Sequence, residues 1–296
     1  MSIKQSMMRK VRGKEAMKKL ELELPEEVIT NIKNKKAREA VANRKGKITQ
    51  VISVLVAVGI WHLISELLVP NLPSPVEWLF GGAEGRGAIV AVQDPFFYNS
   101  IVYSIARVYT GFSLGCLVGI PMGLMMGWNR IANDFGFTTF EMIRPIPPVA
   151  WVPLSIIITG AITPAIVFIT FIGTWYVVTL NSVLGAERLD ESYLRAGKCL
   201  GAKPHQIFRH VVLPGALPSI FTGMVIGMAM SWITVVAGEM IAGDYGLGYM
   251  AWQSYTLIRF PEVILAMLTI GGLGYMSSML IRAVSNRYLR WRAVYG

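Results

Sequence analysis

Residues 193–218, with the sequence YLRAGKCLGAKPHQIFRHVVLPGALP, form a polar segment between two long apolar stretches of the chain. The segment carries the basic side chains Arg195, Lys198, Lys203 and Arg209 and the histidines His205 and His210. Gly201 and Pro204 in its middle indicate a tight turn. Because each flanking stretch is apolar over the length of about 20 residues that crosses a bilayer, the segment is predicted to be a loop outside the membrane.

The composition of the whole chain fits an integral membrane protein. Of its 296 residues, 53% are apolar and 16% are charged, against about 25% charged residues in a typical soluble domain. The two cysteines, Cys116 and Cys199, fall in a predicted span and in the polar loop, so no disulfide framework is implied. The first apolar run begins near Ile48, behind a charged leader and without a cleavage pattern of small residues, so it is predicted to be a retained span and not a signal peptide.

Six stretches of the sequence are long and apolar enough for a membrane span. They are residues 48–69, 104–127, 135–157, 164–185, 216–241 and 261–283. The predicted fold class is therefore all-α, a polytopic membrane protein with about six transmembrane helices. A shallow interfacial helix is expected ahead of the second span, over FFYNSIVYSIARV (96–108). Since proline removes a backbone donor, the third span is predicted to be broken or kinked at its four prolines, which are Pro145, Pro147, Pro148 and Pro153.

The basic residues indicate which side of the membrane each end of the chain occupies. Residues 1–47 hold 14 of the 28 Lys and Arg residues, and most of the others lie in loops 128–134 and 186–214 and at the C-terminal end. Cytoplasmic segments are enriched in Lys and Arg, so both termini are predicted to be cytoplasmic. The net charge of +10 is interpreted as contact with anionic membrane lipid, and no nucleic-acid partner is expected.

Two regions are predicted on this basis. Residues 1–47 form a cytoplasmic basic segment, and residues 48–296 form a transmembrane domain that includes the polar loop 186–214. The leader contains PEEVITNIKNKKAREAVANR (25–44), a predicted helix that lies on the membrane or packs on a cytoplasmic partner. The alternative is a solvated basic arm.

Glycines recur at every fourth residue of the second span. They are Gly111, Gly115, Gly119, Gly123 and Gly127. Together they form a stripe along one helical face, where small side chains allow another helix to approach closely. We predict that this stripe packs within the subunit and does not bind a ligand.

Three ionisable residues are predicted inside the spans, where charged side chains are costly and usually face the interior of the helix bundle. Glu141 and Arg144 lie three residues apart and could pair on one helix face. Both a structural ion pair and a functional role remain open for them. Glu239 could snorkel to the interface, cap the glycine-rich turn in AGDYGLGYMAW (242–252), or act in function.

The polar loop is predicted to contain two short helices. Asp190 is a candidate N-cap for the first of them, which runs through DESYLRAGKCLGA (190–202). Gly201 permits a sharp reversal, and Pro204 begins the second helix, which is expected to end at Leu213-Pro214. A pair of short helices with cationic and apolar faces is suited to docking a partner protein.

This loop resembles the docking loop of ABC importer permeases. The pattern of that family is EAA, three residues, Gly, nine residues, Ile, one residue and Leu-Pro. The chain has the same spacing, with Arg195 in place of the acidic residue and Gly197 in place of the second alanine. The resemblance implies that a coupling helix here inserts into a cleft on an ATPase subunit. The docking residues that it implies are Arg195, Ala196, Gly197, Gly201, Ala202, Val211, Leu213 and Pro214.

Four further segments, residues 72–77, 107–128, 142–158 and 238–250, are similar to the subgroup that imports nitrate, bicarbonate, sulfonates and taurine. This resemblance implies a permease subunit of an ATP-driven, binding-protein-dependent importer of a small anionic solute in a prokaryotic inner membrane. The implied partners are two ATPase subunits, an extracytoplasmic substrate-binding protein and a second permease copy in a homodimer. No cofactor is expected on this chain, because ATP and Mg²⁺ would bind the ATPase subunits. The subgroup also contains permeases for pyrimidine precursors and aromatic carboxylates.

The resemblance also implies a substrate path beside the broken third span. In this interpretation Arg144 is the cation that attracts an oxyanion. The other residues predicted to line or flank the path are Trp151, Trp175, Ser231 and Glu239.

The sequence contains none of the motifs that would indicate an enzyme. It lacks the G-x-x-x-x-G-K-[ST] phosphate loop, so the chain is not expected to bind ATP itself. It also lacks HExxH, and His205 and His210 have no supporting metal ligands. The remaining alternative is a secondary transporter, which would require inverted repeats and coupling acids inside the membrane.

Overall fold

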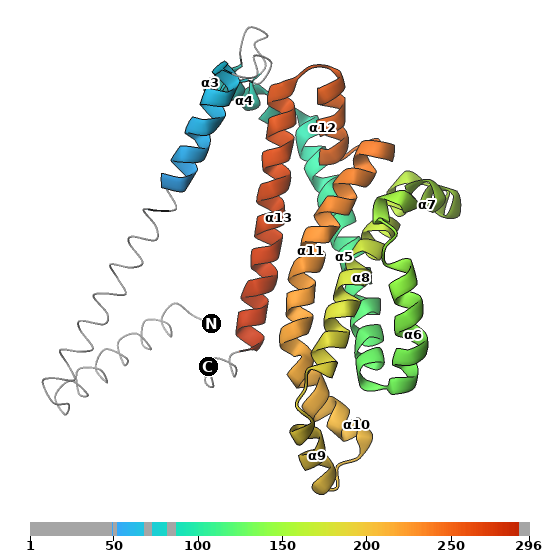
Figure 1. Ribbon diagram of the computed structural model, residues 1–296. Coiled ribbons are helices and arrows are strands. Elements are labelled where there is room, and N and C mark those ends of the chain that lie inside the picture. The colour runs from blue at the N-terminus through green and yellow to red at the C-terminus, as the bar shows by residue number, and fades with distance from the viewer. Residues whose placement is uncertain (1–48, 50–51, 68–72, 82–86, 290–296) are drawn as a thin grey trace, which may run out of the picture. The chain divides into compact units, whose positions relative to one another are not determined.

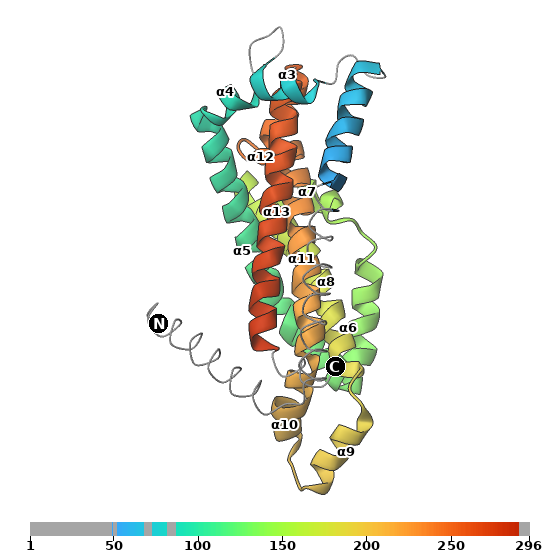
Figure 2. The same cartoon turned by 90° about the vertical axis from the view of Figure 1, so that its left-hand side faces the viewer.

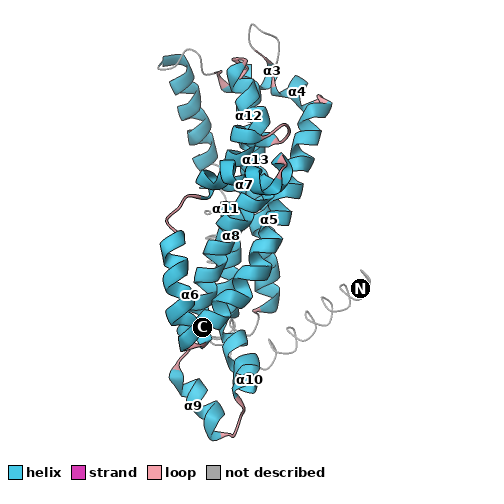
Figure 3. Cartoon of the chain, turned by 90° about the vertical axis from the view of Figure 1, so that its right-hand side faces the viewer, coloured by secondary structure: helices cyan, strands magenta, loops and turns pink. Residues whose placement is uncertain are grey.

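The computed structural model describes residue 49 and residues 52–67, 73–81 and 87–289. The regular elements in these ranges are all helices, without a strand among them (Figure 3), as the sequence predicts. The chain divides into two compact units, residues 1–75 and 76–296, and each is described by itself. The first unit contains the apolar helix Ile52–Leu67, which is shorter than a usual span. The predicted leader segment 1–47 lies outside the described residues.

The second unit is a bundle of long helices with shorter helices at its ends (Figures 1 and 2). Its elements are α3 (Pro75–Phe80), α4 (Ala88–Val92), α5 (Pro95–Trp128), α6 (Arg130–Ile143), a 3-10 helix (Pro148–Trp151), α7 (Val152–Thr159), α8 (Ile162–Glu187), α9 (Glu191–Cys199), α10 (Pro204–Ile207), a π-helix (Phe208–Val212), α11 (Leu213–Ala242), α12 (Leu247–Thr256) and α13 (Phe260–Tyr288).

Within the described residues, four helices are long and apolar enough to cross a membrane. They are Pro95–Trp128, Ile162–Glu187, Pro204–Ala242 and Phe260–Tyr288. The pair Arg130–Ile143 and Pro148–Thr159 adds a fifth span if its two parts are counted together. A total of about six, as predicted, requires the helix Ile52–Leu67 as the remaining span.

The predicted break in the third span is confirmed. Helix α6 and the segment Pro148–Thr159 are bent by 83° relative to each other. The bend occurs around Pro145, Pro147 and Pro148, which supply no backbone N–H groups to continue the helix. Helix α7 then ends at Gly160, whose φ of 69° is the left-handed conformation that closes many helices.

Helix α8 is the central element, because its most extensive contacts are with α5 on one side and α11 on the other. The glycine stripe of α5 faces α8. A Cβ atom added at Gly111 would lie 2.6 Å from Cβ of Thr170, and one added at Gly115 would lie 2.6 Å from Cβ of Thr174. These separations are far below contact distance, so the glycines allow the two helix backbones to approach closely.

Two predicted helix boundaries are wrong. No shallow helix precedes the second span, because α5 is one continuous helix of 34 residues from Pro95. Asp94 caps it by accepting a hydrogen bond from the N–H of Phe96 at 2.8 Å. The predicted helix end at Leu213-Pro214 is also wrong, since the chain continues as one helix of 39 residues from Pro204 to Ala242. The π-helix Phe208–Val212 ends two residues before Pro214, so the wider turn covers the carbonyl groups that the proline ring would otherwise meet and the helix continues.

Helix α12 ends in a turn that usually contains glycine. The N–H of Arg259 donates to the carbonyl of Ser254 at 2.8 Å, and the N–H of Ile258 donates to the carbonyl of Tyr255 at 3.1 Å. This is the Schellman arrangement, which requires a left-handed residue at the position of Ile258. Ile258 has a φ of 59°, and for a side chain branched at Cβ this conformation costs on the order of 1–2 kcal/mol.

Candidate functional site

The helices α9 and α10 project together from one end of the second unit, and α12 lies toward its other end (Figures 1 and 2). Asp190 caps α9 as predicted, because its Oδ1 accepts a hydrogen bond from the N–H of Ser192 at 2.9 Å. This backbone hydrogen bond, with a second contribution from the Ser192 side chain, lowers the pKa of the Asp190 carboxyl below its usual value. The predicted reversal is also present, since Gly201 has a φ of 75° and α10 begins at Pro204.

One face of this projection is anchored to the bundle and the other is open. Leu194 and Phe208 pack against the buried cluster around Val212 and Ala216. By contrast, the Leu200 side chain at the tip is 87% exposed, and a Cβ added at Gly201 would meet no atom within 4 Å. The tip therefore offers apolar surface and open space to a partner.

The predicted docking residues lie along this projection. Arg195, on α9, is exposed and pairs with Glu191 one turn earlier. Gly197 lies on the inner side, where a Cβ would approach Cγ1 of Ile207 at 3.4 Å. Val211 lies in the π-helix, and Leu213 and Pro214 begin α11.

A pocket of about 840 Å³ separates the projection from the ends of α5 and α8. Its lining includes the acidic residues Glu187 and Glu191 and the basic residues Lys198 and Lys203. Gly201 and Ala202 also contribute to the lining. The base of the projection is thus a polar concavity with charges of both signs.

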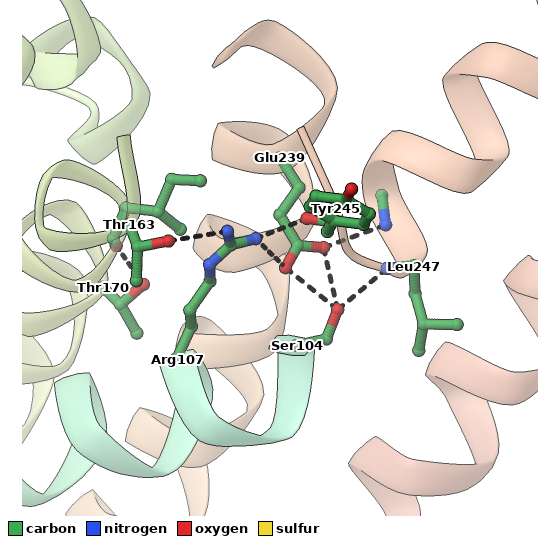
Figure 4. Close-up of polar contacts among 9 residues, drawn as sticks. Ser104, Arg107, Thr163, Thr170, Glu239, Tyr245 and Leu247 are labelled. Carbon is green, nitrogen blue, oxygen red and sulfur yellow. Dashed lines mark hydrogen bonds and ion pairs between the residues drawn. The ribbon is translucent and has the colours of Figure 1, made fainter. Parts of the chain in front are cut away.

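A second group of residues forms a buried ion-pair network near the other end of α11 (Figure 4). Arg107 on α5 and Glu239 on α11 are 3% and 0% exposed, and Nη1 of Arg107 lies 2.9 Å from Oε1 of Glu239. The Glu239 carboxylate also accepts hydrogen bonds from Oγ of Ser104 at 2.9 Å and from the N–H of Gly248 at 3.0 Å. Removing these two charges from water is costly, and the several hydrogen bonds offset that cost.

Arg107 also connects α5 to two other segments. Its Nη1 donates to the carbonyl of Tyr245 at 2.5 Å, and its Nη2 donates to Oγ1 of Thr163 on α8 at 2.9 Å. Ser104 in turn accepts a hydrogen bond from the N–H of Leu247 at 2.8 Å. The network therefore joins α5, α8 and α11 to the turn before α12 and satisfies two N–H groups at the start of that helix.

Glycine is required in the turn that this network holds. Gly246 has a φ of 127°, and a Cβ added there would overlap the Glu239 carboxylate. Of the three roles that the sequence left open for Glu239, the structure shows the cap of the glycine-rich turn. Sequence reasoning missed its partners Arg107 and Ser104. The sequence signal that could have revealed this pair is Arg107 itself, because a cation within an apolar span requires a partner of opposite charge.

The predicted path residues are distributed among different contacts. Arg144 follows α6, and its Nη1 lies 2.6 Å from Oε1 of Glu141; both side chains are nearly half exposed. The Oγ of Ser231 on α11 is 2.6 Å from Oγ1 of Thr174 on α8, in a buried contact. Glu239 belongs to the ion-pair network.

Trp151 and Trp175 are brought together around one aromatic cluster. Both pack against the buried cluster formed by Phe140, Ile172 and Tyr176, and the ring centroids of Trp175 and Phe140 are 5.5 Å apart, edge to face. Within the described residues, both indole N–H groups are buried and have no hydrogen-bond partner. Two N–H donors without an acceptor could donate hydrogen bonds to an anion or to a carbonyl group. The role of these tryptophans in the substrate path stays a prediction.

No group of candidate metal ligands accompanies these residues in the part of the chain that the structure describes. There, no cluster of three or more His, Cys, Asp or Glu side chains could hold a metal ion. The chemistry available at the described sites is ion pairing, hydrogen bonding and apolar contact.

Comparisons with known proteins agree with this architecture. A family model described as "Binding-protein-dependent transport system inner membrane component" matches residues 119–293. The nitrate import permease protein NrtB of Synechocystis sp. is 30% identical over 243 residues, which cover 79% of this chain and 86% of that protein. The bicarbonate transport system permease protein CmpB of Synechococcus elongatus is 29% identical over 239 residues, which cover 78% of this chain and 85% of that protein.

Solved structures are similar to this chain at the level of the fold. An inward-facing form of the MetNI methionine ABC transporter matches with a TM-score of 0.54 and 18% sequence identity. The match covers 64% of this chain and 96% of that chain. At this identity the similarity concerns the helical architecture alone.

Proposed function

We propose that this chain, which belongs to the family of binding-protein-dependent transport inner-membrane components, is the membrane-spanning permease subunit of an ATP-driven importer. Two ATPase subunits on the cytoplasmic side bind and hydrolyse ATP with Mg²⁺, and a substrate-binding protein delivers the solute from the opposite side. Two copies of the permease form the path. Both termini and the α9–α10 projection are cytoplasmic, in agreement with the excess of Lys and Arg in these segments.

The observation that carries this proposal is the shape and exposure of the α9–α10 projection. Leu200 at its tip is 87% exposed, although burial of a leucine side chain contributes about 1.5–3 kcal/mol. The projection is held in place at its base by Leu194 and Phe208. A fixed element with an apolar tip is suited to transmit movement from an ATPase to the transmembrane helices.

We further propose that the solute is a small oxyanion. Support comes from the relatives that are nitrate and bicarbonate permeases at about 30% identity. The side chains assigned to the path are donors suited to such a ligand: the Arg144 guanidinium and the indole N–H groups of Trp151 and Trp175. Uptake by vesicles that contain the complete transporter, compared for nitrate, bicarbonate and taurine, tests this assignment.

The docking role is tested by replacing Gly201 with tyrosine and measuring co-purification with the ATPase subunits of the transporter. Gly160 offers a matched control, because its φ is also positive, at 69°, and a Cβ there would likewise meet no atom within 4 Å. Both substitutions introduce similar backbone strain, but only Gly201→Tyr places a bulky group on the projection. We expect Gly201→Tyr to lose the ATPase and Gly160→Tyr to retain it. Equal retention by both variants would contradict the docking role.

A further inference from the structure

The turn between α12 and α13 exposes an apolar side chain on a strained backbone. Ile258 holds a φ of 59°, and its side chain is 65% exposed. Leu257, directly before it, is also largely exposed. This turn lies at the end of the second unit opposite to α9 and α10 (Figures 1 and 2). We refer to Leu257 and Ile258 as the apolar tip.

The folding of this chain does not account for isoleucine at position 258. The two hydrogen bonds of the turn use backbone atoms only, so glycine would preserve them and would remove the strain. The exposed side chain also gains little from burial within the chain. In the part of the chain that the structure describes, this small gain does not compensate for the strained backbone at this residue. Such a conformation points to contact with another molecule.

The surroundings of the tip indicate a protein partner. A pocket of about 240 Å³ adjoins the turn, and its lining combines apolar residues such as Phe97 and Met250 with polar residues such as Asp94, Gln253 and Arg259. At its edge, Oγ of Ser254 donates a hydrogen bond to Oε2 of Glu262 at 3.0 Å. An apolar centre beside polar groups of both charges is the composition of protein–protein interfaces. Membrane hydrocarbon would not accept these charged groups.

We propose that the apolar tip and the adjoining pocket are a docking surface for the extracytoplasmic substrate-binding protein. Ile258 inserts into an apolar depression on that protein, and the polar groups of the pocket contact its rim. This inference rests on the proposed function, which places the α12–α13 turn on the extracytoplasmic side. The family description, which names dependence on a binding protein, specifies the class of partner.

The test uses the full permease with its ATPase subunits in nanodiscs and the substrate-binding protein of the same transporter. The dissociation constant of the binding protein is measured for the wild type, Ile258→Gly and Ile258→Ala. Glycine removes both the side chain and the strain, whereas alanine removes the side chain and retains a Cβ in the left-handed conformation. We expect both variants to raise the dissociation constant at least tenfold, because side chains buried at the centre of an interface dominate its affinity.

The melting temperature separates docking from a structural role. Ile258→Gly is expected to melt at the wild-type temperature or above it, so its weaker binding cannot result from unfolding. Ile131→Ala is the matched control, since Ile131 on α6 is also an exposed isoleucine; its dissociation constant is expected to equal that of the wild type.

Several outcomes would overturn the proposal. Wild-type affinity in both Ile258 variants would exclude the tip from the interface. Weaker binding in the glycine variant alone would assign the effect to the conformation of the turn. A lower melting temperature in nanodiscs but not in detergent, with unchanged affinity, would make the tip a membrane anchor. If the wild-type complex itself never bound the substrate-binding protein, the proposed function would fail together with this inference.

Discussion

Replacing Glu239 with glutamine tests the buried network directly. The glutamine amide can replace some hydrogen bonds of the carboxylate, but it leaves the Arg107 guanidinium, 3% exposed, without a counter-charge. Removing one member of a buried ion pair costs about 3–5 kcal/mol, because the remaining charge stays away from water. We expect Glu239→Gln to reduce the free energy of unfolding by an amount in this range.

The chain provides an internal control for this magnitude. Glu141 and Arg144 form an ion pair with an even shorter separation of 2.6 Å, but their side chains are 47% and 46% exposed. Solvent-exposed pairs contribute about 0–1 kcal/mol, since water and salt screen them. Glu141→Gln is therefore expected to have little effect, although the charge change is identical.

The assay is equilibrium unfolding in mixed micelles with increasing denaturing detergent, followed by tryptophan fluorescence. A third variant replaces both charges, as Arg107→Met with Glu239→Met. The double variant is expected to lose less free energy of unfolding than the two single variants lose together, because neither charge is left unpaired. If Glu239→Gln lost no more stability than Glu141→Gln, burial would not be what makes the loss of one charge in this ion pair costly.

Two further predictions concern the packing of α5 and the capping of α9. Gly115→Ala is expected to cost about 1–3 kcal/mol of unfolding free energy, because the new Cβ would lie 2.6 Å from Cβ of Thr174; Gly271→Ala, where a Cβ meets no atom within 4 Å, is the control in the same assay. The pKa of Asp190 is lowered in the folded protein. The stabilisation that its ionised side chain gives to α9 is therefore fully present above the usual carboxyl pKa of about 3.9, and it is lost as the pH falls through the lowered folded-state pKa. Hydrogen exchange of the α9 amides, corrected for intrinsic rates, should show this loss in the wild type and not in Asp190→Asn, which retains a capping oxygen without titrating.

Features that depend on local backbone chemistry could be predicted from the sequence. The bend of the third span follows from prolines at 145, 147 and 148, whose missing N–H groups act within one helical turn. The cap at Asp190 and the reversal at Gly201 likewise depend on backbone atoms that lie within a few residues along the chain. For these elements, the residue type alone decides which backbone conformations are available.

Features that depend on distant contacts could not be predicted in the same way. Arg107 and Glu239 are 132 residues apart, and only the fold shows that they pair. The start of α5 was mislocated for a related reason. The second span is predicted from residue 104, whereas Asp94 and Pro95 carry the N-cap and first-turn chemistry of the helix start. A cation that is neutralised by a remote partner can lie well inside a continuous helix.

Helix α12 connects the network with the apolar tip, and substitutions at its two ends should separate stability from docking. Its first N–H groups are held by Ser104 and Glu239, whereas Ile258 follows its last turn in a strained conformation. Glu239→Gln should therefore lower stability and weaken docking together, because α12 loses its attachment to α5 and α11. Ile258→Gly should weaken docking without lowering stability. Weaker binding in both variants, with a loss of stability in Glu239→Gln alone, would be difficult to reconcile with a purely structural role for both residues.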